Sequence, residues 1–471
     1  MYRRRKTKGF FYYFKTLIYA AIAVCAGYCV YQKIVEEQNR FNADEILAQS
    51  VLQNKTFTAK VQEIEESGVK AYLMEEHSNP IVSIDFEFGD SGYAHDQNGK
   101  FGLAQIASRL IMKGAGKYSD KTLLDIMEEN GIRISFGVDN DSLSGAIIFP
   151  KSNSKTAQYL LRLIMFEPKL PEKHLEIIKA QLLKSLEMQN ENPNSVLSLV
   201  YAEQIFANHP YARNPLGKKE DIFKISTDDV RRYLEKTFAK NNLIVGISGD
   251  INQKESKVFL KDIFGELPEK TGQKPLEKFE YNSKGMEFNV KRNIPQVIAI
   301  FSAKGTARTN KDFYPLYLAN YIFGGSGLTS RLNKELRENN GLTYGVYHYM
   351  ANSDAASLLE GKFSASTENF EKAKKLLLEQ WQNLALNGVS ENELEIAKKS
   401  LIDSFNLRFA DISGVSSMLV AMQKYNLGRD FLQKRNDYIR NVTLEKVNET
   451  ASKYYGVEPD FVTIGDERKN K

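Results

Sequence analysis

The sequence predicts an α+β protein with two tandem related domains that follow an N-terminal transmembrane helix. Three observations predict this fold. Strand-like segments alternate with amphipathic helix-like segments from about residue 56 onward. The second half of the chain repeats the element order of the first half. An apolar stretch at residues 10–31 precedes both halves.

The N-terminal residues account for the whole net charge of the protein. The 471 residues include 64 basic and 59 acidic side chains, which gives a net charge of +5. Five basic residues lie close to the start of the chain: Arg3, Arg4, Arg5, Lys6 and Lys8. The remainder is therefore neutral, and its charge gives no indication of nucleic-acid binding.

Cysteine is also confined to the N-terminal segment, at Cys25 and Cys29. The rest of the chain has no cysteine with which to form a disulfide framework, a cysteine zinc knuckle or a catalytic thiol. Because a cysteine-free body folds in either redox compartment, cysteine usage indicates no localisation.

Residues 10–31 predict a membrane anchor. They carry one charge, Lys15, and their length is close to the ~20 residues with which a helix spans a bilayer. The basic tail at residues 1–9 is expected to stay in the cytoplasm, which places the body on the periplasmic side of the inner (plasma) membrane. The alternative is a signal peptide cleaved after Ala23 or Ala26, which would release the body into the periplasm.

Composition and pattern divide the rest of the chain. Residues 32–55 are polar and helix-compatible, as expected for a stalk. Residues 56–266 are assigned to an N-terminal domain and residues 286–468 to a C-terminal domain. The segment between them, 267–285, is rich in charge and contains proline and glycine, which is typical of a linker.

The two domains repeat the same order of predicted strands and helices. A strand begins after Pro80, at Ile81–Phe88, and another begins after Pro295, 215 residues later. Each leads through a polar loop into an apolar helix, Phe101–Met112 or Phe313–Phe323, which is followed by glycine. Each domain closes with a strand that ends in Gly-Asp. A repeat of this length predicts two related domains rather than a solenoid.

A family resemblance becomes specific at residues 102–114, which read Gly-Leu-Ala-Gln-Ile-Ala-Ser-Arg-Leu-Ile-Met-Lys-Gly. This segment resembles the inverted zinc-binding helix of the M16 (pitrilysin- or insulinase-like) metallopeptidases. Their pattern is Gly-Leu-Ala-His-x-x-Glu-His, followed by an apolar stretch and Lys-Gly. By that match, Gln105 and Arg109 occupy the positions of the two zinc-binding histidines, and Ser108 occupies that of the glutamate that activates water.

The family's third ligand, a glutamate, also lacks a counterpart in this match. Anchoring on Asn192-Pro193 places Ser185 at that position, although Glu187 stands two residues away. The five histidines support the loss independently, since the closest pair is 18 residues apart and no two share one helical turn. We therefore expect that this chain binds no metal. Arg109 is either an ordinary polar residue or a retained substrate contact.

The C-terminal domain keeps a second family feature. Its glycine run, Gly324, Gly325, Ser326 and Gly327, and the later segment Leu336–Tyr344 resemble the family's glycine-rich segment and its Arg/Tyr pair, here Arg337 and Tyr344.

The positions of this pair make physical sense. Arg337 falls in the last turn of a helix expected to stop at Gly341, and Tyr344 is expected to open the next strand. Both side chains can therefore reach one place and donate hydrogen bonds to an oxyanion. The alternatives are a helix-dipole partner for the arginine and a core position for the tyrosine. The glycine run is either a tight turn or an anion-binding loop on the substrate side.

The resemblance implies a fold and a function. Each domain is expected to be an antiparallel-rich sheet covered by helices. The chain is expected to be the non-catalytic subunit of a heterodimeric zinc peptidase, without enzymatic activity or a cofactor of its own, and to lend Arg337 and Tyr344 to a zinc-bearing M16 partner. The substrate would be an unfolded peptide added to a sheet edge. The alternatives are a non-enzymatic scaffold and a homodimeric peptide-binding protein.

Overall fold

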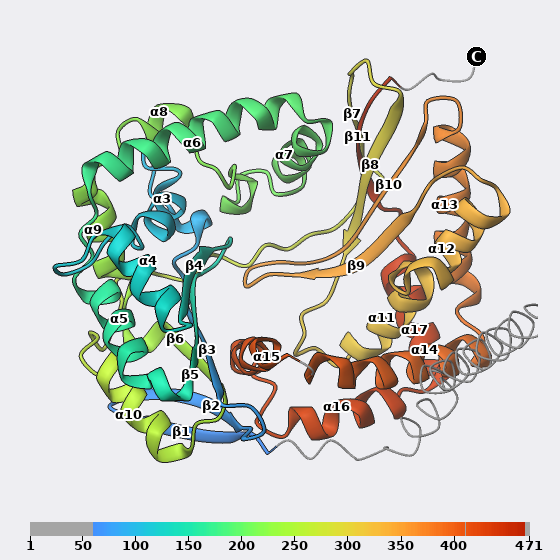
Figure 1. Cartoon of the computed structure of the whole chain (residues 1–471). Coiled ribbons are helices and arrows are strands. Elements are labelled where there is room, and N and C mark those ends of the chain that lie inside the picture. Colours follow the sequence, from blue (N-terminus) through green and yellow to red (C-terminus); the bar gives the residue numbers. More distant parts are fainter. Residues whose placement is uncertain (1–59, 410, 467–471) are drawn as a thin grey trace, which may run out of the picture. The chain divides into compact units, whose positions relative to one another are not determined.

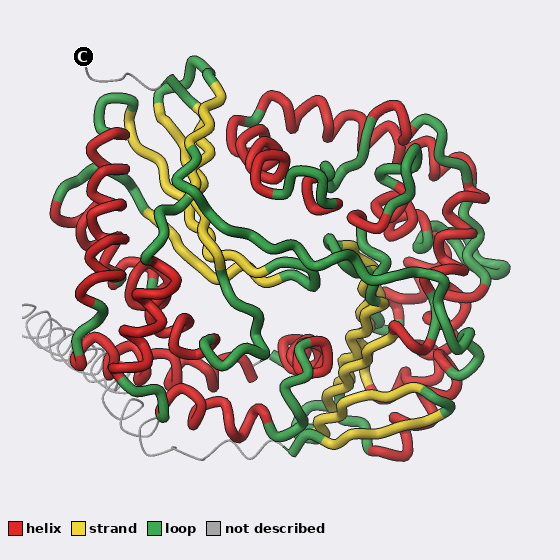
Figure 2. The backbone as a smooth tube through the Cα atoms, turned by 180° about the vertical axis from the view of Figure 1, so that it is seen from behind, coloured by secondary structure: helices red, strands yellow, loops and turns green. Residues whose placement is uncertain are grey.

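The protein is described by a computed structural model (Figure 1). The structure describes residues 60–409 and 411–466. These residues belong to one compact unit. We call residues 60–266 the first half and residues 286–466 the second half. The predicted linker, residues 267–285, forms no helix or strand (Figure 2).

The first half contributes a six-stranded sheet. Its strands are β1 Gln62–Glu66, β2 Val69–Glu75, β3 Ile81–Phe88, β4 Arg133–Val138, β5 Leu143–Pro150 and β6 Leu243–Gly249. They lie in the order β1-β2-β6-β3-β5-β4. All neighbours are antiparallel except β2 and β6, which are parallel.

The second half contributes a five-stranded sheet with the same topology. Its strands are β7 Glu287–Val290, β8 Gln296–Lys304, β9 Val346–Asn352, β10 Ser357–Ser366 and β11 Asp460–Ile464. Their order, β7-β11-β8-β10-β9, repeats the first sheet without β1, and again only one pair, β7 and β11, is parallel. The predicted α+β fold is confirmed, and the strands after Pro80 and Pro295 occupy equivalent places in the two sheets.

Helices cover both sheets. Those of the first half are α3 Leu103–Leu110, α4 Asp120–Glu129, α5 Ser154–Phe166, α6 Glu172–Glu191, α7 Pro193–Ile205, α8 Lys219–Ile222, α9 Thr227–Thr237 and α10 Gln253–Phe264. Those of the second half are α11 Phe313–Asn320, α12 Arg331–Asn333, α13 Phe370–Asn387, α14 Glu391–Asp403, α15 Ile412–Lys424, α16 Phe431–Arg440 and α17 Leu444–Tyr455. Two π-helical segments, η5 Tyr321–Gly325 and η7 Lys334–Asn339, extend α11 and α12.

Short 3₁₀ turns connect several of these elements. They are η1 Tyr93–His95, η2 Lys151–Asn153, η3 Pro210–Ala212, η4 Lys240–Asn242, η6 Gly327–Thr329 and η8 Ser404–Phe409.

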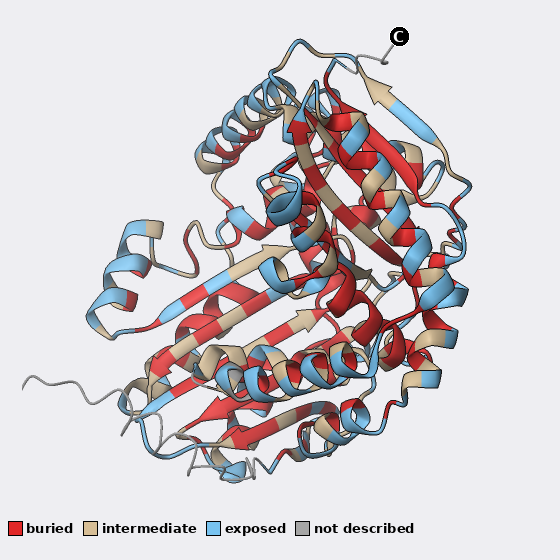
Figure 3. Cartoon of the chain, turned by 90° about the vertical axis from the view of Figure 1, so that its right-hand side faces the viewer, coloured by how far each residue is buried: buried red, intermediate tan, exposed pale blue. Residues whose placement is uncertain are grey.

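One face of each sheet packs on a large apolar core. Along β3, Val82, Ile84 and Phe86 are buried against helices of the first half, whereas the alternate residues Ser83 and Asp85 point to the opposite face. The second sheet follows the same rule, since alternate residues of β8 contact a second core of buried helical side chains. Buried and less buried positions alternate along the strands in Figure 3.

The other face of each sheet is covered by a helix from the opposite half. Helix α7 of the first half packs against β8 and β11, where Leu197 and Tyr201 meet Ile300 and Val462. Helix α15 of the second half packs against β6, β3 and β2. The two halves therefore exchange helices, and each sheet depends on the other half for its second layer.

The contact between α15 and the first sheet is close and polar. Ser416 Oγ lies 2.9 Å from Ser83 Oγ and donates a hydrogen bond to the carboxylate of Asp85. Gly246 of β6 permits this approach, because a Cβ atom there would lie 2.2 Å from the Ser416 carbonyl oxygen. Burial raises the pKa of Asp85, and the hydrogen bonds from Ser416 and Ser417 oppose this shift.

A buried histidine lies in the aromatic core of the second half. His348 of β9 is 1% exposed and stacks on Phe301, with Phe323 and Trp381 against its edges. Neither ring nitrogen has a hydrogen-bond partner among the described residues. Burial without compensation lowers the pKa of His348 to about 3, so the ring is neutral in the folded protein.

The expected membrane localisation is corrected by the structure. Within residues 60–409 and 411–466, no helix has the length and apolar character needed to cross a membrane. The stretch predicted as an anchor, residues 10–31, and the predicted tail and stalk lie outside the described residues.

We expect Gly246→Ala to destabilise the protein. The added methyl group would overlap the backbone of α15, and overpacking of this kind typically costs about 1–3 kcal/mol. Urea unfolding measures the change. Gly137→Ala in β4 is the matched control, because a Cβ there meets only Ser144 Oγ at 3.5 Å. Equal stabilities for the two variants would contradict the close approach of α15.

We expect His348→Phe to flatten the loss of stability in acid. In the unfolded chain this histidine takes up a proton below about pH 6.5 but in the folded protein only near pH 3, so acidification favours unfolding. The drop in unfolding free energy between about pH 7 and pH 5.5 should therefore shrink by about 1 kcal/mol in the variant.

His77→Gln provides the opposite control. Hydrogen bonds to Asp250 and Glu75 raise the pKa of His77, so its protonation favours the folded state, and its removal should steepen the acid loss. Chemical unfolding at the two pH values measures both effects. If His348→Phe has the same pH dependence as wild type, the conclusion that the His348 ring is buried and lacks a hydrogen-bond partner is wrong.

Candidate functional site

Helix α3 carries the three degenerate positions of the zinc motif. Its N-cap residue is Gly102, whose φ of +105° suits glycine. The carboxylate of Asp96 accepts hydrogen bonds from the backbone N–H of Gly102 at 2.8 Å and of Ala104 at 3.0 Å. Asp96 therefore caps the helix although it lies six residues before Gly102, and sequence reasoning missed it for that reason.

The capping carboxylate is deeply buried. Asp96 is 5% exposed, and burial raises its pKa to about 7, against the effect of the backbone N–H groups and of Arg213. Arg213 donates a hydrogen bond to the carbonyl oxygen of Asp96 at 2.9 Å and stacks over Phe101, 4.7 Å from the ring centroid. This network holds the start of α3 in place.

The side chains at the motif positions do not form a metal site. Ser108 is buried and its hydroxyl donates to the Gln105 carbonyl oxygen at 3.0 Å, while Arg109 is exposed. An amide, a hydroxyl and a guanidinium are poor ligands for zinc, and the guanidinium adds a positive charge. The residues present therefore do not fit the ion.

The fourth position lies on the neighbouring helix. Helix α6 packs against α3 (Figure 1) and carries Ser185, whose hydroxyl donates to the Gln181 carbonyl oxygen at 2.9 Å. The alternative residue, Glu187, is exposed and pairs with Lys184 at 3.6 Å. Over the described part of the chain, no group of three or more histidine, cysteine, aspartate or glutamate residues is arranged to hold a metal ion.

The glycine run of the second half is a packing element. Gly324 and Gly325 end the π-helical segment η5, which contacts β9. A Cβ at Gly324 would lie 2.5 Å from the Cβ of His348, so only glycine lets the segment approach the strand. Gly327 has a φ of +65°, and its carbonyl oxygen accepts a hydrogen bond from Ser330 Oγ at 2.8 Å. Ser326 lies between Gly325 and Gly327, and its backbone N–H donates a hydrogen bond to the Tyr321 carbonyl oxygen.

Arg337 and Tyr344 flank the turn that follows η7. Gly341 takes the left-handed conformation expected past a helix end, with φ of +61°, and its N–H donates to the Arg337 carbonyl oxygen at 3.1 Å. Both side chains are exposed, and Tyr344 is 86% exposed. Strand β9 begins at Val346, two residues later than the prediction that Tyr344 opens it.

Asn333 positions this turn, and sequence reasoning missed it. Its side chain is 1% exposed, accepts from the Val346 N–H at 3.2 Å and donates to the Val346 carbonyl oxygen at 2.7 Å. The same amide nitrogen lies 2.9 Å from the Gly327 carbonyl oxygen. One asparagine therefore ties the glycine run to the strand that follows Tyr344. An asparagine within a predicted helix could have indicated this role, because asparagine has a low helix propensity.

Arg331 has a different role from Arg337. Its guanidinium makes two 2.7 Å hydrogen bonds to the carboxylate of Glu393, which lowers the pKa of that carboxyl to about 2. This bidentate pair joins α12 to α14. Among the described residues, no hydrogen bond or ion pair joins the degenerate zinc positions to Arg337 or Tyr344.

Comparisons with known proteins agree with these features. The family model described as "Peptidase M16 inactive domain" matches residues 224–401, which contain the glycine run and the Arg/Tyr pair. A Helicobacter pylori protein named "Non-peptidase homolog YmxG" is 26% identical over 87% of this chain and 95% of its own length. A Bacillus subtilis protein named "Uncharacterized zinc protease YmxG" is 21% identical over 83% of this chain and 94% of its own length.

A solved structure shows the same fold. The crystal structure described as a peptidase M16 inactive domain from Pseudomonas fluorescens superposes with a TM-score of 0.81 at 24% identity. The match covers 87% of this chain and 99% of that one. Together with the doubled sheet topology, these matches show that residues 224–401 match the M16 inactive domain and that the chain has the fold of that solved structure.

Proposed function

We propose that this chain is a non-catalytic M16 subunit that presents Arg337 and Tyr344 to a peptide bound at the zinc site of a partner chain. The observation that carries the proposal is the contrast between the two sites. The zinc positions hold Gln105, Ser108 and Arg109, whereas the tyrosine of the second site is 86% exposed.

The exposure of Tyr344 argues against a structural role. A tyrosine ring contributes to stability by burying its apolar surface, and a ring this exposed contributes little. A tyrosine packed in the core, which was the alternative for Tyr344, would be buried, whereas this side chain is exposed. Arg337 is exposed at a helix end, where the helix dipole favours it in any case, so the argument depends on the tyrosine.

The proposed chemistry divides between the two chains. A zinc ion on the partner would supply Lewis-acid activation of water and of the scissile carbonyl. From this chain, the Tyr344 hydroxyl and the Arg337 guanidinium would donate hydrogen bonds to the carbonyl oxygen as negative charge develops on it.

The peptide itself needs an extended binding surface. Strand β9 follows the pair directly and lies at an edge of the second sheet, with β10 on one side only. Its free backbone groups could pair with an extended peptide, which fits an unfolded substrate. The alternative functions are a non-enzymatic scaffold and a homodimeric peptide-binding protein, and neither requires the tyrosine hydroxyl.

We expect the purified chain to bind no stoichiometric zinc and to cleave no peptide. The reason is the replacement of all three ligands and of the catalytic glutamate. Elemental analysis after metal removal, reloading with zinc and gel filtration provides the measurement. About one zinc per chain would contradict the assignment of Gln105, Ser108, Arg109 and Ser185.

We expect Tyr344→Phe to abolish most turnover of the complex with a zinc-bearing partner. The loss of one donor to a developing oxyanion lowers kcat by about 10²–10³. Packing should not change, because the side chain is exposed, so assembly and zinc content of the complex should match wild type. Arg337→Ala should also raise KM, because a charged donor is lost.

Two further variants serve as controls. Tyr438→Phe removes the hydroxyl of another partly exposed tyrosine, on α16, and should leave turnover unchanged. Arg331→Ala breaks the pair with Glu393 and should therefore lower the melting temperature. Its effect on kcat should be smaller than that of Arg337→Ala. If Tyr344→Phe has the wild-type rate in an assembled, zinc-loaded complex, the scaffold function becomes the better proposal.

A further inference from the structure

One lysine of the second sheet has no counter-ion. Lys362 of β10 is partly buried, and within the described part of the chain its ammonium group makes no hydrogen bond or ion pair. Burial lowers the pKa of Lys362, while the negative charge of Glu360 opposes this shift. A cation in this position loses hydration without gaining a partner, so an anion beside it would be stabilising.

Glu360 is not that partner, because its carboxylate is engaged elsewhere. It lies two residues before Lys362, so both side chains point to the same face of β10. The Glu360 carboxylate accepts a hydrogen bond from the Tyr349 hydroxyl, and among the described residues no ion pair joins it to Lys362. An anion for Lys362 therefore has to come from a ligand.

Two exposed tyrosines lie beside Lys362 on this face. Tyr347 of β9 is the register partner of Lys362, and Tyr349 is that of Glu360. The Tyr347 side chain is 63% exposed and that of Tyr349 is 46% exposed. Helix α7 packs on β8 and β11, which lie beyond β10 in this sheet (Figure 1). The exposure of the two rings shows that the β9 end of the face is open.

This patch continues the Arg337/Tyr344 site along β9. The Tyr347 ring leans back toward Tyr344, since a Cβ built on Gly345 would lie 3.5 Å from the Tyr347 hydroxyl oxygen. Tyr344 and Tyr347 are three residues apart in sequence, which is about 10 Å of extended chain. A peptide with its scissile carbonyl at Tyr344 that runs along β9 therefore passes Lys362 about three residues from that bond.

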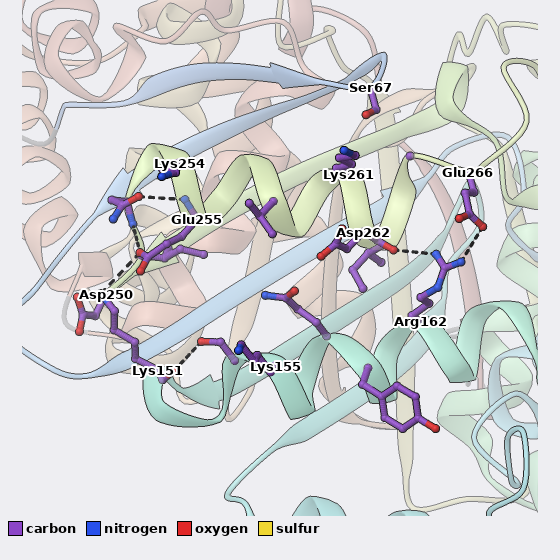
Figure 4. A pocket seen from close by; sticks show the side chains of 18 residues that line it. Ser67, Lys151, Lys155, Arg162, Asp250, Lys254, Glu255, Lys261, Asp262 and Glu266 are labelled. Atoms are coloured by element: carbon purple, nitrogen blue, oxygen red, sulfur yellow. Dashed lines mark hydrogen bonds and ion pairs between the residues drawn. The ribbon is translucent and has the colours of Figure 1, made fainter.

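The hollow between α5 and α10 of the first half does not indicate a ligand in this way (Figure 4). Its basic and acidic side chains are nearly equal in number, and several pair with each other. Lys151 lies 2.9 Å from Asp250, and Arg162 lies 2.7 Å from Glu266. The charge of that surface is therefore largely balanced within the chain, unlike the charge of Lys362.

We propose that Lys362 selects peptide substrates with an acidic side chain about three residues from the scissile bond. The inference rests on the proposed function, because Tyr344 fixes where that bond lies. The carboxylate of the peptide pairs with the Lys362 ammonium group in a charge-assisted hydrogen bond. The rings of Tyr347 and Tyr349 contact the aliphatic part of the acidic side chain and its neighbours.

The first test measures binding to the purified full chain. Fluorescence anisotropy gives the Kd of extended peptides of about ten residues that differ only in one central residue, which is Glu, Gln or Lys. We expect the Glu peptide to bind about fivefold more tightly than the Gln peptide, as a partly buried ion pair allows. Lys362→Met should abolish this difference, and Lys362→Glu should reverse it in favour of the Lys peptide.

Lys304→Glu is the matched control. It makes the same charge change on the same face of the sheet, four residues along β8 from Ile300, the register partner of Lys362. The preference for the Glu peptide should be unchanged in this variant, and circular dichroism confirms the folding of each variant. Equal affinities for the Glu and Gln peptides, or a preference for Glu that survives in Lys362→Glu, would overturn the proposal.

The complex with a zinc-bearing partner tests the position of the acidic residue. Mass spectrometry of the products should locate the cleaved bond about three residues from the glutamate, and a cut without fixed spacing from it would contradict the path along β9. If Tyr344→Phe keeps the wild-type rate while the Lys362 variants still switch the Kd preference, the peptidase role fails and the acidic selection remains. If Tyr344→Phe abolishes turnover and no Kd preference exists, only the selection by Lys362 is wrong.

Discussion

The close contact between α15 and strand β6 is the constraint on which the rest of the structure depends. Gly246 brings the helix backbone against the sheet, and the Ser416 hydroxyl then reaches both Ser83 and Asp85. On this face of the first sheet, Ser83, Asp85 and Gly246 are small or polar, and they match the Ser416 turn of a helix whose other buried residues are apolar. Helix α7 makes the equivalent contact on the second sheet through apolar residues. The exchange joins two related halves into one compact unit.

The two candidate sites differ in their side chains rather than in their frameworks. Around α3 the scaffold is intact, with Asp96 capping the helix and Arg213 supporting the cap, although the side chains that would bind zinc are replaced. In the second half, framework and side chains are both present. Asn333 and Gly324 fix the turn, and Tyr344 extends from it into solvent.

The local elements could be predicted from the sequence, but their supports could not. Ile81–Phe88 and Leu243–Gly249 alternate or concentrate apolar residues, and both are strands with those bounds. The repeat after Pro80 and Pro295 correctly indicated equivalent strands. Asp96 and Asn333 were missed because they act on backbone groups outside their own segments. The contact of Gly246 with Ser416 joins residues 170 positions apart, which no local pattern reveals. The positions of the candidate site came from the family resemblance.

The helix exchange has a consequence for the order in which the chain matures. Ser83 and Ser416 are 333 residues apart in sequence, yet they share a buried hydrogen bond. During synthesis the first sheet therefore emerges long before α15, and its second face stays open to water until almost the whole chain has left the ribosome. Contacts between such distant residues are formed late and slowly. The first half is therefore exposed to wrong partners during this interval, until α15 covers the face that carries Ser83 and Asp85.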